Sequence, residues 1–171
     1  MIGDRWGVSG DEVARRYPCD DLVSDPVLQA WRGVSVQATP EVIWAWIGQI
    51  RLAPYSYDRI DNFGRRSPQE LRDLPEPAPG QNFSASAGRP LGRIISVSPR
   101  EHLTARIAGA FMSYVLVPRG SGESVTRLLL KVVMEGRRWT APVISVGDLV
   151  MARRQLLNLK RLAETPTMAA L

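Results

Sequence analysis

One stretch of sequence decides the fold: Trp31-Arg32-Gly33-Val34-Ser35-Val36-Gln37-Ala38-Thr39-Pro40-Glu41-Val42-Ile43-Trp44. In its first half, Val34, Val36 and Ala38 alternate with polar residues, which is typical of a half-buried strand. In its second half, Thr39 can act as an N-cap and Pro40 suits the first position of a helix. The stretch therefore predicts a strand over residues 31–38 that leads directly into a short helix.

The predicted helix has an apolar side that can pack on a sheet. Glu41 lies in its first turn, where a negative charge is favourable. Residues of the apolar stripe recur at helical spacing, which predicts burial of one face; they are Val42, Ile43, Trp46, Ile47 and Ile50. We expect a second short helix between Ala53 and Gly64, ended by the glycine. Residues 65–80 carry four prolines and many charges, and they predict an exposed loop.

Downstream, the chain reads as a series of short strands followed by one long helix. Turn-forming residues separate the predicted strands, which are residues 81–85, 92–98, 102–108, 111–117 and 124–134. The last strand is the clearest, because apolar side chains fall on one face while Arg127 and Lys131 fall on the other. The final helix is expected from about Ser145 to Ala163. This order predicts an α+β domain in which a curved antiparallel sheet wraps around the C-terminal helix.

The first thirty residues predict an N-terminal extension with one short helix. Ser9 and Glu12 have the spacing of a capping box, and Val8 and Val13 that of a hydrophobic staple. Residues 31–165 then form the main domain, and residues 166–171 a tail. The start of the chain lacks the pattern of a signal peptide, Cys19 is the single cysteine, and no apolar run is long enough to cross a bilayer. We therefore expect a cytoplasmic protein without a disulfide or membrane span.

The formal net charge of +5 raises the question of nucleic-acid binding. The basic residues, however, come as separated pairs rather than as one stripe, so we expect no nucleic-acid partner. The sequence contains no glycine-rich phosphate loop, no nucleophile elbow and no cluster of metal-ligand spacing. We expect neither a metal nor another cofactor.

Two polar residues interrupt the apolar side of the final helix. Leu149, Ala152, Leu156, Leu159 and Ala163 form its stripe, Met151 and Leu162 widen it, and Asp148 and Gln155 lie within it. A carboxylate on a buried face is costly unless it is paired. Asp148 should therefore meet an arginine or a tyrosine hydroxyl, or face a ligand cavity.

A second dense polar and aromatic patch contains Tyr55, Tyr57, Asp58, Asp61 and Asn62. Tyrosines can orient a mostly apolar ligand through their hydroxyl groups. They can equally pack this segment against the sheet while Asp58 caps it. Both interpretations of the patch remain open at this point.

The order of elements resembles the START and pollen-allergen-like superfamily, also called the polyketide cyclase and lipid-transport superfamily. Residues 31–44 are similar to its opening strand and Pro-Glu-x-Val helix start. Residues 53–62, 147–151 and 155–160 look like a bacterial branch of unassigned function. The resemblance spans about residues 30 to 163. It implies a helix-grip fold, with two short helices after the first strand, and a cavity between sheet and C-terminal helix that accepts lipids, polyketides or aromatic metabolites.

The favoured function is therefore binding of a hydrophobic small molecule. The expected ligand-binding residues are Tyr55, Tyr57, Trp46, Ile107, Leu128, Leu130, Asp148, Met151, Ala152 and Gln155. One alternative is a cyclase or dehydratase without a metal, in which Asp148 or Asp58 acts as base and the Tyr57 hydroxyl steadies an enolate. A second alternative is a protein-interaction module whose core is filled by side chains.

Overall fold

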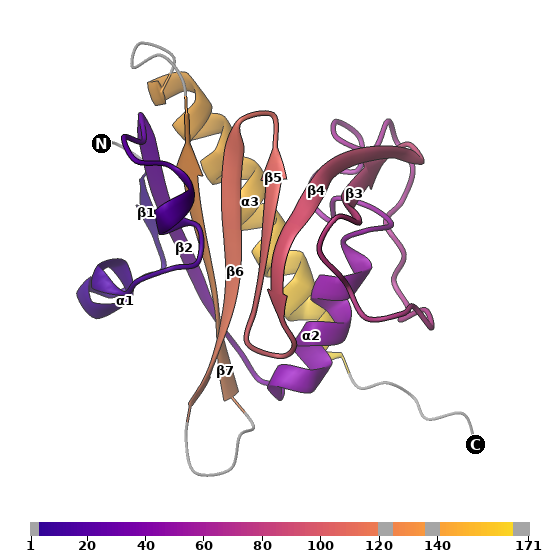
Figure 1. Cartoon of the computed structure of the whole chain (residues 1–171). Coiled ribbons are helices and arrows are strands. Elements are labelled where there is room, and N and C mark those ends of the chain that lie inside the picture. Colours follow the sequence, from indigo (N-terminus) through magenta and orange to yellow (C-terminus); the bar gives the residue numbers. More distant parts are fainter. Residues whose placement is uncertain (1–3, 120–124, 136–140, 166–171) are drawn as a thin grey trace.

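The computed structural model describes residues 4–119, 125–135 and 141–165, with side chains described for residues 4–119, 125–135 and 151–165. Figure 1 shows one sheet with the long helix α3 lying across one face and the N-terminal segment on the other. The elements are β1 (Arg5–Trp6), α1 (Gly10–Ala14), a 3-10 turn (Asp20–Leu22), β2 (Leu28–Val36), α2 (Pro40–Gln49), β3 (Asn82–Ser86), β4 (Arg89–Ser98), β5 (His102–Ile107), β6 (Ala110–Arg119), β7 (Val125–Met134) and α3 (Ala141–Glu164). This is the predicted α+β helix-grip architecture.

The described strands form one seven-stranded sheet in the order β1-β2-β7-β6-β5-β4-β3. All neighbouring pairs are antiparallel except β1 and β2, which are parallel. The parallel β1 strand was not predicted from the sequence. A register shift between Ile94 and Ser96 in β4 marks a bulge, which increases the local bend of a strand. The bent sheet leaves room beneath it for α3 (Figure 1).

The strand and helix predicted from residues 31–44 are both present. Strand β2 begins at Leu28, earlier than expected, and α2 has Thr39 at its N-cap position and Pro40 in its first turn. Ile43, Trp46, Ile47 and Ile50 are buried as predicted. Val42 is 39% exposed, so its assignment to the apolar stripe was wrong. Trp44 is buried in the core instead, and its indole Nε1 donates a 2.9 Å hydrogen bond to Glu76 in the following loop.

The second short helix predicted between Ala53 and Gly64 is wrong, because this segment consists of turns and bends. Tyr55 and Phe63 have φ angles of 56° and 50°, which lie outside the right-handed helical region. Local side chains also compete for the backbone groups that a helix would use. The Tyr57 N–H donates to Asp61 Oδ2 at 3.0 Å, and the Ser67 N–H donates to Asp58 Oδ2 at 2.8 Å.

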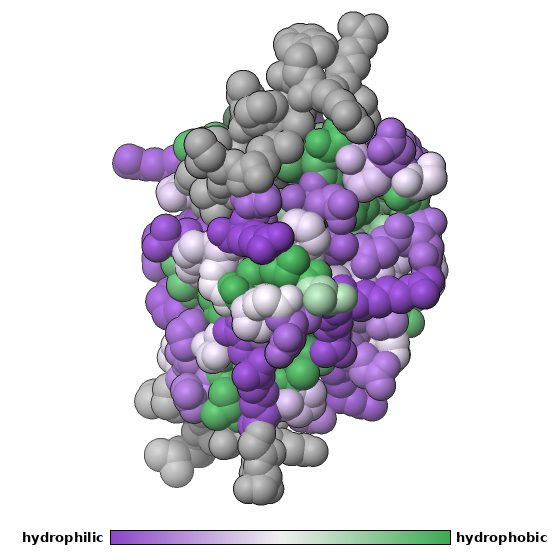
Figure 2. All heavy atoms as spheres, turned by 90° about the vertical axis from the view of Figure 1, so that its left-hand side faces the viewer, coloured by the Kyte–Doolittle hydropathy of each residue, from purple (hydrophilic) through white to green (hydrophobic). Residues whose placement is uncertain are grey.

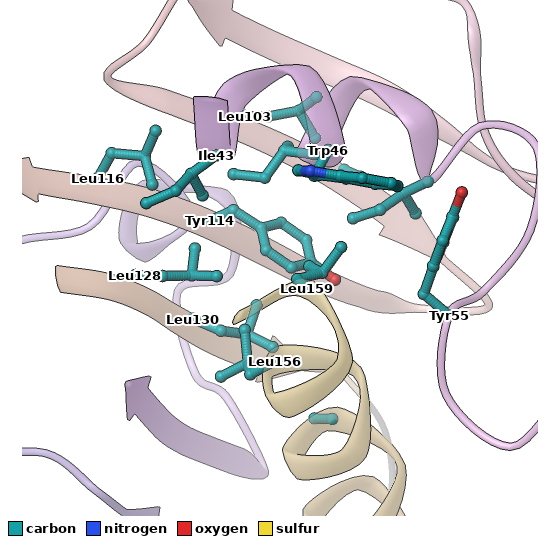
Figure 3. Packing of buried hydrophobic residues seen from close by; sticks show 14 of the residues in the cluster. Ile43, Trp46, Tyr55, Leu103, Tyr114, Leu116, Leu128, Leu130, Leu156 and Leu159 are labelled. Atoms are coloured by element: carbon teal, nitrogen blue, oxygen red, sulfur yellow. The ribbon is translucent and has the colours of Figure 1, made fainter. Parts of the chain in front are cut away.

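The core lies between the inner face of the sheet, α2 and α3 (Figure 3). Leu128, Leu130 and Val132 of β7 point into it, which confirms the face predicted for this strand. Four of the five stripe residues predicted on the final helix are buried there, namely Ala152, Leu156, Leu159 and Ala163. Leu149 lies outside the residues whose side chains are described. Among the described residues, no helix is both long enough and apolar enough to span a lipid bilayer.

The N-terminal segment covers the outer face of the sheet. The predicted capping box is present, with Ser9 and Glu12 bonded to each other's backbone N–H groups. Glu12 is buried and accepts hydrogen bonds from Arg127 at 2.8 Å and from Arg119 at 3.1 Å. Arg127 and Lys131 do lie on the face opposite the core, as predicted, but the segment covers that face. Its apolar contacts form a second cluster: Tyr17, Cys19, Val23, Trp31, Phe111, Val115, Leu129 and Val133.

The side of the molecule that carries β1 and α1 faces the viewer in Figure 2. Hydrophilic residues cover most of this side and surround a small hydrophobic area. Ion pairs fasten the N-terminal segment here. Lys131 pairs with Asp20 and its ammonium group stands 4.8 Å from the centre of the Trp31 ring. The segment is therefore held by charge pairing as well as by apolar burial.

Candidate functional site

A cavity of about 240 Å³ lies between the inner face of the sheet and α3. Its wall is mainly apolar and comes from β3 to β7, α3 and the turn after α2. The lining residues are Pro54, Ser56, Asp61, Phe83, Ser84, Leu91, Ile107, Met112, Tyr114, Leu130, Val132, Met151, Ala152 and Gln155. A mostly apolar pocket with a few polar groups is the usual form of a small-molecule site.

Strand pairing explains why residues distant in sequence share this wall. In the register of β6 and β7, Met112 lies opposite Val132 and Tyr114 lies opposite Leu130. Alternate residues of a strand point to the same face, so all four side chains turn toward α3. Figure 3 shows the Tyr114 ring pointing into the space between the sheet and the helix.

Hydrogen bonds explain why Gln155, one of the two polar residues on the apolar side of the final helix, can be buried there. The Tyr114 hydroxyl donates a 2.6 Å hydrogen bond to Gln155 Oε1, and Gln155 Nε2 donates to the Pro54 carbonyl at 2.6 Å. Both side chains are almost fully buried. Gln155 therefore joins three separate parts of the cavity wall, and its amide has a partner at each end.

Asp61 and Ser84 place two further polar atoms beside the cavity. Asp61 Oδ2 accepts hydrogen bonds from the Ser56 hydroxyl and from the Tyr57 N–H. Asp61 Oδ1 and Ser84 Oγ are both buried and have no hydrogen-bond partner among the described residues. Leaving buried polar atoms unpaired costs free energy.

The environment of Asp61 also changes its acidity. Burial raises the pKa of this carboxyl, the Tyr57 N–H bond opposes the rise, and the nearby charge of Asp58 adds to it. A carboxyl with a raised pKa and one unpartnered oxygen can accept a hydrogen bond or a proton from a molecule in the cavity.

Five of the ten expected ligand-binding residues line this cavity: Ile107, Leu130, Met151, Ala152 and Gln155. Trp46 and Leu128 lie in the packed core instead. Tyr55 is 1% exposed, stands edge-on to Trp46 at 6.2 Å between ring centres, and accepts a 2.7 Å hydrogen bond from Gln49 Nε2. Burial raises the pKa of the Tyr55 hydroxyl. Tyr55 thus joins its segment to α2, as Figure 3 shows.

Asp58 and Tyr57, two of the three candidate catalytic residues, line a different hollow next to the cavity. Both oxygens of Asp58 accept hydrogen bonds from Ser67, one from its N–H and one from its hydroxyl. Tyr57 is 37% exposed, and the guanidinium of Arg154 stands 5.8 Å from the centre of its ring. The side chain of Asp148, the third candidate, lies outside the described residues.

Tyr114, Ser84 and Phe83 line the cavity but were not among the expected site residues. The alternation Met112, Tyr114, Leu116 was the available signal for Tyr114, because these residues occupy one face of a strand. Asp61 was noted only as part of the polar patch. Its surroundings include β3, because the Ser86 hydroxyl donates a hydrogen bond to the Asp61 carbonyl, and this contact between distant residues cannot be predicted from the sequence near Asp61.

Three other residues of types that can carry chemistry lie apart from the cavity. His102 is half-buried at the start of β5, and Arg106 is exposed with its guanidinium 5.2 Å from the centre of the Phe111 ring. Cys19 belongs to the N-terminal segment and is fully buried against the sheet, and burial raises the pKa of its thiol. Among the described residues, no three His, Cys, Asp or Glu side chains are grouped to hold a metal ion.

Comparisons with known proteins support the fold. No family model matches the chain, and no curated protein matches it. The protein MLL2253 from Mesorhizobium loti superposes with a TM-score of 0.52 at 18% identity, covering 82% of this chain and 99% of the other. The protein NE0264 from Nitrosomonas europaea superposes with a TM-score of 0.51 at 14% identity, covering 81% and 95%.

A third solved structure is named for the polyketide cyclase type. The Polyketide_cyc-like protein Cgl2372 from Corynebacterium glutamicum has a TM-score of 0.49 at 12% identity, covering 83% of this chain and 94% of the other. Similarity at these identities concerns the fold alone. The superpositions on MLL2253 and NE0264 show that the chain shares its fold with these two proteins.

Proposed function

We propose that this protein is a member of the START and polyketide cyclase-like superfamily and binds a compact apolar molecule in the cavity under the sheet. The observation that carries the proposal is a pair of buried atoms, Asp61 Oδ1 and Ser84 Oγ, that have no hydrogen-bond partner among the described residues and belong to the wall of a mainly apolar cavity. A ligand hydroxyl can donate to the carboxylate oxygen, and the Ser84 hydroxyl can donate to or accept from a polar group of the ligand.

The size of the cavity favours one class of ligand. Its volume of about 240 Å³ lies just below the range of roughly 300–1,000 Å³ typical of sites for drug-sized molecules. A single aromatic or polyketide-like ring system suits this volume better than a lipid with two acyl chains. The polar groups of Asp61 and Ser84 would orient such a ligand, while Ile107, Met112 and Val132 would contact its apolar body.

Titration with the neutral fluorescent probe N-phenyl-1-naphthylamine tests this function. The wild-type protein should bind the probe saturably, with a blue shift of its emission. Ile107→Trp should fill part of the cavity. It should weaken probe binding at least about tenfold, because the indole ring would occupy the volume in which the apolar probe is buried. Ile95→Trp is the matched control, since Ile95 is an exposed residue on β4 outside the cavity.

Equal probe affinity in the two tryptophan variants, with circular dichroism showing both folded, would contradict binding at this cavity. Native mass spectrometry of the protein purified from its own host then identifies the natural ligand class. A copurified compact hydrophobic mass is the expected result, and it should be absent from Ile107→Trp.

A cyclase or dehydratase activity is the second candidate function, and the position of Asp61 favours it. Among the described carboxylates, Asp61 lines the cavity and has a pKa raised by burial, as a general base requires. Incubation of the copurified ligand with wild type and Asp61→Asn tests this role. A mass change produced by the wild type alone supports catalysis, and an unchanged ligand mass with both proteins argues for binding without reaction.

The interaction-module alternative required a space filled by side chains. A cavity of about 240 Å³ argues against this alternative. One water molecule needs only about 10–15 Å³ of such volume, so the space is much larger than a packing defect between side chains.

A further inference from the structure

We infer that a second hollow, separate from the apolar cavity, binds an oxyanion such as a phosphate or carboxylate group. It has a volume of about 290 Å³ and lies between α3 and the segment of residues 55–69. Four arginines line it: Arg59, Arg66, Arg154 and Arg161. We call it the arginine pocket.

One wall of the arginine pocket is a stripe of α3. Arg154, Asn158 and Arg161 are spaced by four and three residues, so they lie on the same side of the helix. Met151, Ala152 and Gln155, which line the apolar cavity, form a neighbouring stripe. The helix therefore presents a basic side and an apolar side to two adjacent hollows.

The opposite wall is a turn segment that is held in place by several hydrogen bonds. Asp58 accepts from the Ser67 N–H at 2.8 Å and from the Ser67 hydroxyl at 2.5 Å. Asn158 Nδ2 donates to the Tyr55 carbonyl at 2.9 Å and thereby attaches the segment to α3. These bonds position Arg59 and Arg66 against the arginines of the helix.

The positive charge of the pocket is poorly compensated. Among the described residues that line it, Asp58 is the one acidic residue, and both of its oxygens already accept hydrogen bonds from Ser67. Within the described part of the chain, none of the four guanidinium groups forms an ion pair with a carboxylate. Arg161 donates a 2.7 Å hydrogen bond to the neutral Gln69 side chain, and Arg154 stands over the Tyr57 ring.

Four cations around one hollow repel one another, and a bound anion converts that repulsion into attraction. The guanidinium group is planar and carries several donors, so it matches the paired oxygens of phosphate and carboxylate groups. The pocket thus has both the positive charge and the hydrogen-bond donors for an oxyanion.

The sequence offers matched controls for this site. Arg66 and Arg154 line the pocket, while their sequence neighbours Arg65 and Arg153 do not. Arg153 stands 5.0 Å over the Trp6 ring instead. Substituting glutamine for Arg66 or for Arg65 removes one positive charge from the same segment, and the same holds for Arg154 and Arg153. The two variants of each pair then differ only in whether the lost charge lined the pocket.

Isothermal titration with inorganic phosphate, at constant ionic strength balanced with sodium chloride, tests the inference. Wild-type protein should bind one phosphate, and Arg66→Gln and Arg154→Gln should each weaken binding about fivefold, as expected for loss of one partly solvated charged contact. Arg65→Gln and Arg153→Gln should stay within about twofold of wild type. Equal losses in all four variants would show only a general charge effect and would overturn the site.

The oxyanion can belong to a free small molecule or to a lipid headgroup, and sedimentation with vesicles distinguishes the two. Binding of phosphate without sedimentation with phosphatidylglycerol vesicles indicates a free molecule. Sedimentation that Arg66→Gln and Arg154→Gln abolish, while phosphatidylcholine vesicles leave the protein in solution, indicates a headgroup. Failure to bind both phosphate and anionic vesicles would refute the site, whereas binding of the neutral naphthylamine probe would still report on the apolar cavity.

Discussion

The hydroxyl group of Tyr114 donates a 2.6 Å hydrogen bond to Gln155 Oε1 and so connects strand β6 to helix α3 at the wall of the cavity. Both side chains are buried, and Gln155 is bonded in addition to the Pro54 carbonyl. This bond explains how a polar amide is accommodated on the apolar side of the final helix. Removing this bond should therefore weaken the attachment of α3 to the sheet.

Tyr114→Phe should lower the free energy of unfolding by about 1–3 kcal/mol, because the buried Gln155 Oε1 loses its donor. Urea denaturation monitored by circular dichroism measures the change. Tyr57→Phe is the control, and it should change stability by less than about 0.5 kcal/mol because Tyr57 is exposed. Equal effects of the two substitutions would contradict the role assigned to the Tyr114 bond.

Asp61→Asn should stabilise the protein at pH 7. Burial raises the pKa of Asp61, so the folded state disfavours the ionised carboxyl, and this cost grows as pH rises above the ordinary Asp pKa toward the folded-state value. The gain from Asp61→Asn should therefore shrink as pH falls toward 4. Denaturant titrations of both proteins at pH 4, 5 and 7 measure it.

Asp58→Asn provides the contrast to Asp61→Asn. Asp58 accepts two hydrogen bonds from Ser67, and an asparagine amide has a single acceptor oxygen, so this substitution should destabilise at pH 7. A stabilising effect of Asp58→Asn, or a destabilising effect of Asp61→Asn, would argue against these surroundings of the two carboxylates.

Glu12→Gln should loosen the N-terminal segment from the sheet and cost about 1–3 kcal/mol at pH 7. The hydrogen bond from Arg127 is the main cause that holds the pKa of Glu12 below its ordinary value. The stabilisation is therefore present above the unfolded-state pKa and disappears as pH falls through the lower folded-state value. Hydrogen exchange of residues 5–14 should accelerate in the variant at pH 7.

Asp11→Asn is the control for Glu12→Gln, since Asp11 is an exposed residue in the same helical turn. It should leave exchange of the segment nearly unchanged. If Glu12→Gln behaves like Asp11→Asn, the ion pair with Arg127 does not fasten the segment.

Gly92→Ala should destabilise the sheet by about 2 kcal/mol or more. Gly92 has a φ of +70°, and a Cβ atom there would lie 2.5 Å from the Arg106 carbonyl oxygen on the neighbouring strand. Gly10→Ala, in the first turn of α1, meets nothing within 4 Å and should be neutral or slightly stabilising. In thermal unfolding, the Tm of Gly92→Ala should fall several degrees below that of the wild type, while the Tm of Gly10→Ala should stay the same or rise slightly.

Much of the fold follows from local patterns. The alternation of residues 31–38 and 124–134, the start at Thr39 and Pro40, and the capping box at Ser9 each depend on neighbours in the sequence. Strand period, helix period and capping chemistry act over a few residues, so these elements could be predicted. The conformation of the segment between Ala53 and Gly64 could not be predicted in this way. Its positive φ angles and its side-chain-to-backbone hydrogen bonds replace the helix that its sequence pattern suggested.

The sites depend far more on tertiary structure. Ile107, Leu130, Ala152 and Gln155 were expected near a ligand because each lies on an apolar face, and they do line the cavity. Asp61 and Ser84 acquire their importance from strand β3 and the turn that bury them. The Arg66 and Arg154 side chains lie far apart in the chain, and their common pocket exists only because the turn segment is bonded to α3.

By itself, the sequence determined most of the strands, the helices α2 and α3, and the apolar faces of β7 and α3, because these properties arise from contacts between near neighbours. Only the tertiary structure decided that the N-terminal segment covers the outer face, that a cavity remains under the sheet, and that separated arginine pairs contribute to one pocket. The physical reason is that burial, unpaired polar atoms and gathered charge are properties of surfaces brought together from distant parts of the chain.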